Sequence, residues 1–227
     1  MKGGINLRVS VAIDGPAGAG KSTIAKILAK RFHLMYINTG AMYRAVTLKA
    51  LEKGIMPMDT EKLMQLMDDL DMRFENDDLI LNGENVNEQV CMPLISNNVS
   101  NYAAVAEVRE RLVYLQRKMS EKYNVVMDGR DIGTVVLKDA PFKFYLTASA
   151  EERANRRYTE LRNKGIDVDY KELLEDIKKR DYIDSHREVN PLTKAEDAIE
   201  IDSSSLNIEQ VVDKMAEYIN NRIGHVI

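Results

Sequence analysis

Short apolar segments alternate with amphipathic segments along the chain. Residues 9–13 form a short, β-branched run that ends at Gly15 and Pro16, which is typical of a buried parallel strand. Further runs of this kind, each near an amphipathic helix, occupy residues 34–37, 124–128, 142–146 and 198–202. The alternation predicts an α/β fold in which helices cover a parallel sheet.

The last predicted helix has the clearest apolar face. Asn207 is a suitable N-cap residue, and a stripe of apolar positions at helical spacing follows it: Ile208, Val211, Val212, Met215, Tyr218 and Ile219. We expect this stripe to pack in the core.

Residues 72–86 interrupt the alternation of strands and helices. Short apolar pieces there surround Asp77 and Asp78, and the pair Asn82 and Gly83 favours a tight turn. Such a unit inside a parallel α/β chain predicts a small antiparallel β insertion packed on the edge of the sheet.

Composition and charge restrict the class of protein. The chain has 227 residues, 44% of them hydrophobic, which is enough for one sizeable core. Its net charge of -4 has the wrong sign for non-specific binding to a nucleic acid polymer. Cys91 is the single cysteine, which excludes an intrachain disulfide and fits a reducing cytosol. No apolar run is long enough to cross a bilayer, so we expect an unprocessed cytoplasmic protein.

The segment after the first strand fits the phosphate-binding P-loop pattern G-x-x-x-x-G-K-[ST]: Gly15, Pro16, Ala17, Gly18, Ala19, Gly20, Lys21 and Ser22. Its glycines allow backbone N–H groups to converge on phosphate oxygens, and the helix that follows adds its own N-terminal amides. Lys21 supplies a positive charge, and the Ser22 hydroxyl can bind Mg²⁺. A nucleotide site is therefore predicted, although a kinase, an ATPase and a GTPase switch would all share it.

Two further motifs follow predicted strands. Residues 38–44 open a helix, where the Thr39 hydroxyl and Arg44 could hold an acceptor. At the end of another strand, Asp128 is followed by Arg130 and Asp131. Ligands bind at the carboxyl ends of strands in open parallel sheets, so we expect Asp128 to orient magnesium-bound water.

Two charged helices complete the candidate chemistry. Arg153, Arg156 and Arg157 share one face of a helix, either as solvated surface or as part of a lid that closes over a transferring phosphoryl group. Arg180, Asp184 and Arg187 lie at i, i+4 and i+7 of a later helix. This second face could reach a sugar and a phosphate, and a structural salt bridge is an equal alternative.

Together, the P-loop and the segments 38–44, 128–136 and 180–187 resemble the bacterial cytidylate kinase family. The motif D-G-R-D-x-G-T-V-V at 128–136 is more specific than the P-loop, and residues 72–86 resemble the insertion of the bacterial members. The resemblance implies a three-layer P-loop fold with a five-stranded parallel sheet. It also implies a monomer of pyrimidine metabolism that phosphorylates CMP and dCMP with ATP and Mg²⁺.

The resemblance further implies three parts that move on ligand binding. The CORE comprises residues 7–38, 104–150 and 170–227, the monophosphate-binding region with its insertion comprises 39–103, and a short LID comprises 151–169. Gly165 and its polar neighbours would allow the LID to move.

The resemblance also implies a role for each candidate residue. ATP is expected to bind residues 15–23, which adds Thr23 to the P-loop. The expected CMP-binding residues are Thr39 near the pocket, Ser100, Arg109 and Asp131 at cytosine, Arg44 and Arg130 at the phosphate, Arg180 and Asp184 at the ribose, and Arg187 at either group. The expected catalytic residues are Lys21, Arg130, Arg153 and Arg157. Family members often carry Ser at position 39 and Gly at position 22, so the hydroxyl contacts can differ here.

The chemistry of the residues agrees with this reading. A nucleoside monophosphate already presents an anionic oxygen, so no general base is needed, and His33, His186 and His225 all lie outside the P-loop and the Asp128 motif. Cytosine needs an acceptor for its amine and donors for its ring nitrogen and carbonyl, which Asp131, Arg109 and Ser100 supply.

Other functions remain as alternatives. A regulatory GTPase would need N-K-x-D, but the acid at Asp167 comes one position late after Asn163 and Lys164. A kinase for adenylate, thymidylate or a small alcohol such as shikimate would share the P-loop. The acceptor-side arginines disfavour a module that only binds nucleotide.

Overall fold

A parallel five-stranded sheet organises the chain. The computed structural model describes residues 9–223, so the predicted CORE boundaries at 7 and 227, and His225, lie outside the described residues. The strands of the sheet, in the spatial order β2-β6-β1-β7-β8, are Met35–Asn38, Val125–Gly129, Ser10–Asp14, Phe142–Thr147 and Ile199–Asp202. The predicted α/β class and all five strands are confirmed, with most bounds shifted by one residue.

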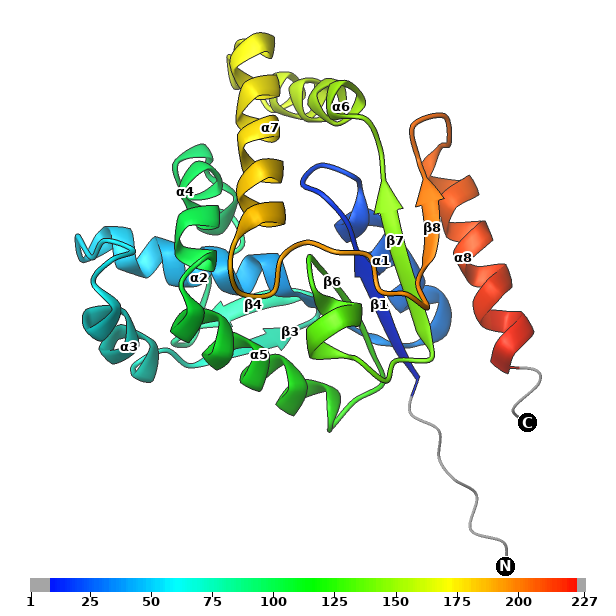
Figure 1. Ribbon diagram of the computed structural model, residues 1–227, viewed down its shortest axis with the longest axis horizontal. Coiled ribbons are helices and arrows are strands. Elements are labelled where there is room, and N and C mark those ends of the chain that lie inside the picture. The colour runs from blue at the N-terminus through cyan, green and yellow to red at the C-terminus, as the bar shows by residue number, and fades with distance from the viewer. Residues whose placement is uncertain (1–8, 224–227) are drawn as a thin grey trace, which may run out of the picture.

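Helices cover both faces of the sheet (Figure 1). The helices are α1 Lys21–Phe32, α2 Thr39–Glu52, α3 Thr60–Asp68, α4 Pro93–Ala103, α5 Ala106–Ser120, α6 Ala150–Asn163, α7 Tyr170–His186 and α8 Ile208–Ile223. On one face Val11, Val126 and Phe144 pack with apolar side chains of α1 and α8. On the other face Ala12 and Met127 pack with α2 and α5. This alternation along the strands produces the three layers.

The predicted stripe on the last helix is mostly correct. Val211, Val212, Met215 and Ile219 of α8 are buried, and Asn207 accepts a hydrogen bond from the Gln210 amide at 2.9 Å, as a cap residue should. Ile208 was predicted wrongly, because it stays 51% exposed in the first turn, before the helix reaches the sheet.

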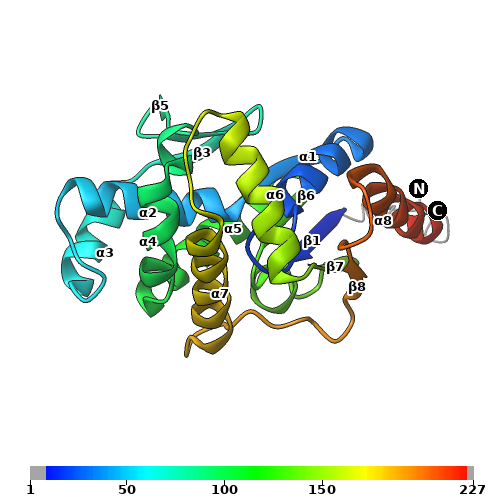
Figure 2. The same ribbon diagram turned by 90° about the horizontal axis from the view of Figure 1, so that it is seen from above.

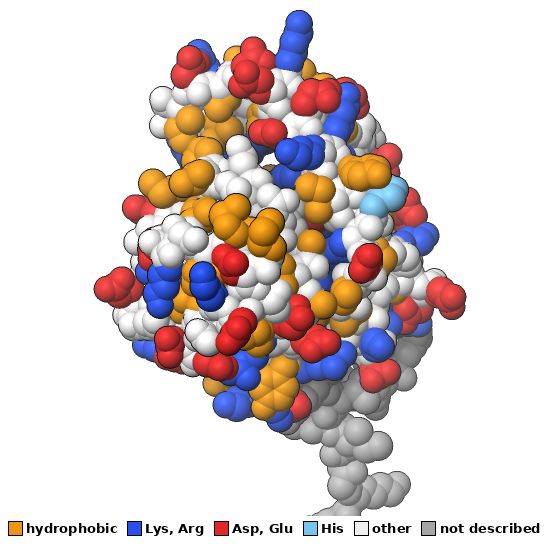
Figure 3. Space-filling model, turned by 60° about the vertical axis from the view of Figure 1, so that its left-hand side comes forward, with side chains coloured by type: hydrophobic (Ala, Val, Ile, Leu, Met, Phe, Trp, Pro, Cys, Tyr) orange, Lys and Arg blue, Asp and Glu red, His pale blue; other side chains and the backbone are white. Residues whose placement is uncertain are grey.

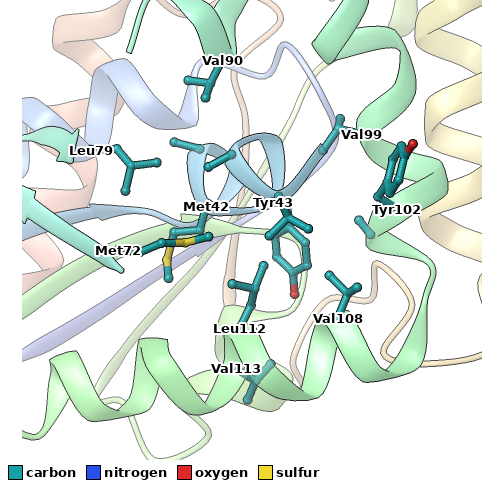
Figure 4. Packing of buried hydrophobic residues seen from close by; sticks show 14 of the residues in the cluster. Met42, Tyr43, Met72, Leu79, Val90, Val99, Tyr102, Val108, Leu112 and Val113 are labelled. Atoms are coloured by element: carbon teal, nitrogen blue, oxygen red, sulfur yellow. The ribbon is translucent and has the colours of Figure 1, made fainter. Parts of the chain in front are cut away.

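The insertion forms a separate antiparallel sheet. Its strands are β3 Met72–Glu75, β4 Asp78–Leu81 and β5 Glu84–Asn85, followed by a short 3₁₀ turn, η1 Gln89–Cys91. It forms no strand pairs with the five-stranded sheet and lies against α2. Met72 and Leu79 pack with Met42 of α2 in one apolar cluster (Figure 4), and all three side chains are almost fully buried there.

The carboxyl ends of the strands point toward α6 and α7 (Figure 1). The chain turns at Asp14 into the P-loop, and η2 Ile132–Val136, one turn of π-helix, follows β6. Seen from above, α6 lies over β1 and β6, with α7 and α4 on one side of it and α8 on the other (Figure 2). Since the sheet order reverses at β1, this edge is where an open α/β sheet binds its ligand.

Candidate active site

A cleft of about 530 Å³ lies at this edge of the sheet. Most of the predicted site residues line it: Ala17, Gly18, Lys21, Ser22, Thr39, Arg44, Ser100, Arg109, Asp128, Arg130, Asp131, Arg157, Arg180, Asp184 and Arg187. The other predicted residues, which are not among those that line it, are Gly15, Pro16, Ala19, Gly20, Thr23 and Arg153. The fold therefore gathers residues from seven separate elements into one place.

The P-loop backbone sets one half of the cleft. Gly15 has φ +147°, and a Cβ there would lie 2.0 Å from the Leu146 carbonyl oxygen, so no other residue fits without displacing β7. Gly20, at φ +90°, is the left-handed residue from which α1 begins. The Lys21 ammonium donates to the carbonyls of Gly15 and Pro16, both at 2.7 Å. Burial, and then the nearby Arg130, lower the pKa of Lys21.

Asp128 joins the P-loop helix to the sheet. Its two carboxylate oxygens accept from the Ser22 hydroxyl and the Tyr36 hydroxyl, each at 2.8 Å. Burial, and then the Asp128 charge, raise the pKa of Tyr36, so this phenol stays a donor. Ser22 and Asp128 together offer the hard oxygen atoms that Mg²⁺ prefers. Among the described residues no group of three His, Cys, Asp or Glu could hold a metal, so phosphate oxygens would have to complete such a site.

The other half of the cleft centres on Asp131. Arg109 of α5, only 1% exposed, forms a salt bridge with the Asp131 carboxylate and donates to the Ala103 carbonyl at 3.0 Å. Arg187 lies 3.7 Å from the other Asp131 oxygen. The Arg109 guanidinium also stands over the Tyr43 ring, 5.2 Å from its centroid. A buried acid is thus held rigidly by two cations at the bottom of the cleft.

Asp184 of α7 gathers a second group of cations. It accepts from Arg130 at 2.8 Å and from Ser100 at 3.4 Å, and Arg187 lies 3.9 Å away. Burial alone would raise the pKa of Asp184, but these arginines outweigh burial and hold its pKa below the usual range. The predicted pairing of Asp184 with charged neighbours is present, although Arg187 lies one residue beyond the end of α7.

Several arginine side chains lie close together between these two halves. Burial, and then repulsion from Arg130, lower the pKa of Arg180 to about 10, and Arg44 adds to this repulsion. The Nε atoms of Arg44 and Arg180 are buried and have no hydrogen-bond partner. Cations that are crowded together and incompletely paired favour a bound anion.

The three arginines of α6, which are spaced to share one helix face, contact different partners. Arg153 is buried and donates to Asp181, to the Ala17 carbonyl at 2.9 Å and to the Ala148 carbonyl at 3.0 Å. Arg156 reaches the Ser203 carbonyl at 2.6 Å. Of the three, Arg157 alone lines the cleft, where it pairs with Glu160. The side chains of Arg153, Arg156 and Arg157 therefore extend from one helix to three different sets of partners.

Several residues of the site escaped the sequence analysis. Tyr36, Tyr43 and Asp181 each contact a predicted site residue. Tyr43 lies within the segment 38–44 but was given no role, and Tyr36 and Asp181 belong to no motif. Asp14 was also missed, although a carboxylate at the end of the first strand, directly before the P-loop, was a usable signal.

Comparison with known proteins agrees with the geometry. The family model for cytidylate kinase matches residues 11–221. A cytidylate kinase of Clostridium perfringens strain SM101 is 66% identical over 215 residues, 95% of this chain and 99% of that protein. One of Clostridium acetobutylicum is 65% identical over 217 residues, 96% of this chain and 100% of that protein. A solved structure of an uncharacterised Eubacterium ventriosum protein shares the fold, with a TM-score of 0.53 at 17% identity, over 94% of this chain and 99% of that one. The chain belongs to the cytidylate kinase family.

Proposed function

We propose that this enzyme phosphorylates CMP and dCMP with Mg-ATP, giving CDP or dCDP and ADP by direct in-line transfer. The observation that carries the proposal is the buried Asp131 carboxylate, fixed by Arg109 and Arg187 in the half of the cleft away from the P-loop. Family membership and the relatives named cytidylate kinase support the same reaction.

The base is read by the groups around Asp131. A carboxylate accepts from the exocyclic amine of cytosine, while Arg109 and Ser100 offer donors for the ring nitrogen and the carbonyl. Uracil would turn a carbonyl toward the carboxylate and leave a buried acceptor without a donor, which disfavours UMP.

The phosphates would lie between the two halves. Arg44, Arg130 and Arg180 would hold the acceptor phosphate and ribose, with Asp184 as an acceptor for sugar hydroxyls. Lys21 would leave the P-loop carbonyls to follow the donor phosphates, and Arg157 would approach from α6. The acceptor phosphate is itself the nucleophile, so these residues act by alignment and by stabilising charge.

Ser22 would bind Mg²⁺ directly and Asp128 would do so through water. The ion, when bound with ATP, supplies charge neutralisation at the donor phosphates. The Ser22 hydroxyl and the Asp128 carboxylate lie 2.8 Å apart, so the fold places these two oxygen ligands side by side.

We further propose that residues 151–169 act as the LID, closing against the CORE and the monophosphate-binding region 39–103. Arg157 would move with this segment, whereas Arg153 is bonded to the P-loop and to α7. Closure would bring Arg157 to the transferring group and exclude water.

We propose that the partners are small nucleotides, that the enzyme is a monomer and that it works in the cytoplasm. Lys or Arg and Asp or Glu side chains are interspersed over the face shown in Figure 3, which does not favour a nucleic acid polymer. No helix of residues 9–223 is long and apolar enough to cross a membrane.

The test is ADP release from Mg-ATP with CMP, dCMP, UMP, AMP, GMP, dTMP or shikimate as acceptor. We expect turnover mainly with CMP and dCMP, and an Asp131→Ala variant should lose discrimination against UMP. Equal use of CMP and UMP by the unaltered enzyme would contradict the role of Asp131. Tight GTP binding with slow hydrolysis and no acceptor turnover would favour a regulatory switch instead.

A further inference from the structure

Asp14 ends β1 and is 3% exposed, yet it is not among the residues that line the cleft. One of its carboxylate oxygens accepts from the Ile132 amide and the other from the Gly133 amide, both at 2.7 Å. A buried carboxylate therefore binds two successive backbone N–H groups of a distant segment, the two residues that follow Asp131.

The segment that Asp14 holds is an unusual one. Residues 132–136 form a single π-helical turn closed by the Leu137 amide and the Ile132 carbonyl at 2.7 Å. π-helical turns are rare and are frequently found at functional sites. Its far end is held by Arg117 of α5, which donates to the Val135 carbonyl at 2.6 Å and to the Val136 carbonyl at 3.3 Å. The segment is thus fixed at both ends by charged side chains.

The packing around Gly133 leaves little freedom. A Cβ at Gly133 would lie 3.3 Å from the Asp14 carboxylate and 3.2 Å from the side chain of Lys143. The absence of a side chain at Gly133 therefore helps the main chain to approach the carboxylate closely. These two amides belong to the residues directly after Asp131, so their hydrogen bonds restrain the main chain next to Asp131.

We propose that Asp14 is a positioning residue that sets acceptor specificity by fixing the main chain directly after Asp131. Because Asp14 also immediately precedes the P-loop, one carboxylate fixes the start of the donor loop and the orientation of the base-reading acid. This inference rests on the proposed CMP kinase activity and adds a determinant of its specificity.

A purely stabilising role does not explain the choice of an acid here. Burial raises the pKa of Asp14 to about 6, even though two backbone N–H groups favour the charged form. The charged and titratable groups nearest to it are Asp131, which opposes its ionisation, Lys21, which favours it, and Tyr145 of β7. The Lys143 ammonium is turned away toward Asp197. The fold therefore contains a carboxylate at a buried position that disfavours its charge, and groups with such shifted pKa values cluster at functional sites.

The first test is steady-state kinetics of Asp14→Asn. An amide has one acceptor oxygen, and its NH₂ group would face the second backbone N–H. We expect the ratio of kcat/KM for CMP to that for UMP to fall about tenfold, through KM for the monophosphate, with a smaller change in KM for ATP. Val212→Ala is the matched control, since it weakens the core of α8 without touching either loop, and it should leave the ratio unchanged.

The second test uses the unaltered protein and is independent of whether Asp14→Asn folds. In ¹⁵N-labelled protein, the chemical shift of the Gly133 amide should titrate with a midpoint near pH 6. The ratio of kcat/KM for CMP to that for UMP should fall as the pH is lowered through the same range. Both acceptors carry the same phosphate, so its own titration cancels in the ratio. In Asp14→Asn both profiles should be flat.

Each outcome decides one question. An unaltered ratio in folded Asp14→Asn, or a Gly133 signal that does not titrate, would overturn the role of Asp14. A protein that uses no CMP at all would refute the proposed function, and the amide titration would still show whether the carboxylate holds the segment.

Discussion

The two halves of the cleft are built in different ways. The half that we propose for the donor is one continuous segment, residues 15–22, whose backbone amides would bind the phosphates. The acceptor half is assembled from side chains of α2, α4, α5, α7 and the turn after β6, which are held by ion pairs such as Arg109 with Asp131. The donor half therefore depends on local conformation, and the acceptor half depends on the completed fold and on balanced buried charge.

Lys21 tests the donor half with the largest expected effect. Lys21→Met should lower kcat about 10²–10³-fold, because it removes a buried cation from the donor phosphates. The melting temperature should stay the same or rise, because an ammonium whose pKa burial lowers is replaced by an apolar chain. Lys30→Met, on the exposed face of α1, is the control and should change neither quantity. Near-normal turnover in Lys21→Met would contradict the assignment.

This difference between the halves also explains what could be predicted. The five strands and the P-loop were identified correctly because their signals lie within a few consecutive residues. The apolar stripe of α8 was identified for the same reason, apart from Ile208. Local patterns report secondary structure and backbone sites directly.

Pairings between distant residues could not be predicted in this way. Arg153 binds Asp181, 28 residues along the chain, and Asp14 binds amides 118 and 119 residues away. The spacing on α6 gave no sign that its three arginines would separate, because flexible side chains choose partners that only the tertiary structure provides. The family resemblance named 15 of the residues that line the cleft, but it did not indicate which acids hold them.

The buried ion pair of the acceptor half offers the next largest effect. Arg109→Met leaves Asp131 facing only Arg187, so the free energy of unfolding should fall by about 3 kcal/mol. Arg111→Met on the same helix removes an exposed pair with Asp68 and should change it by less than about 1 kcal/mol. Urea unfolding of both variants measures the contrast. Equal losses would show that the acceptor half does not depend on its buried pair.

Arg157 tests whether the LID contributes to chemistry. Arg157→Gln should lower kcat about tenfold with little change in stability, because its pair with Glu160 is partly exposed. Lys164→Gln is the matched control, since Lys164 pairs with the same Glu160 but is not among the residues that line the cleft. Steady-state rates at saturating ATP and CMP make the comparison. Similar rates for both variants would remove Arg157 from the catalytic residues.

Asp14 gives the smallest expected effect, which is on the pH dependence of the unfolding free energy. Its sign is opposite to that of a carboxylate whose pKa is lowered on folding. Its folded pKa of about 6 lies above the unfolded value of 3.8, so the folded state binds more protons between these limits. Its contribution to stability is therefore fully present below the unfolded value and is lost as pH rises through 6. Lowering the pH from 7 to 5 should raise the unfolding free energy of the natural protein, relative to Asp14→Asn, by about 1 kcal/mol. Asp184, whose pKa is lowered, has the opposite dependence, but it is common to both proteins and cancels. A difference that stayed constant between pH 7 and pH 5 would show that burial does not raise the pKa of Asp14 in the folded protein.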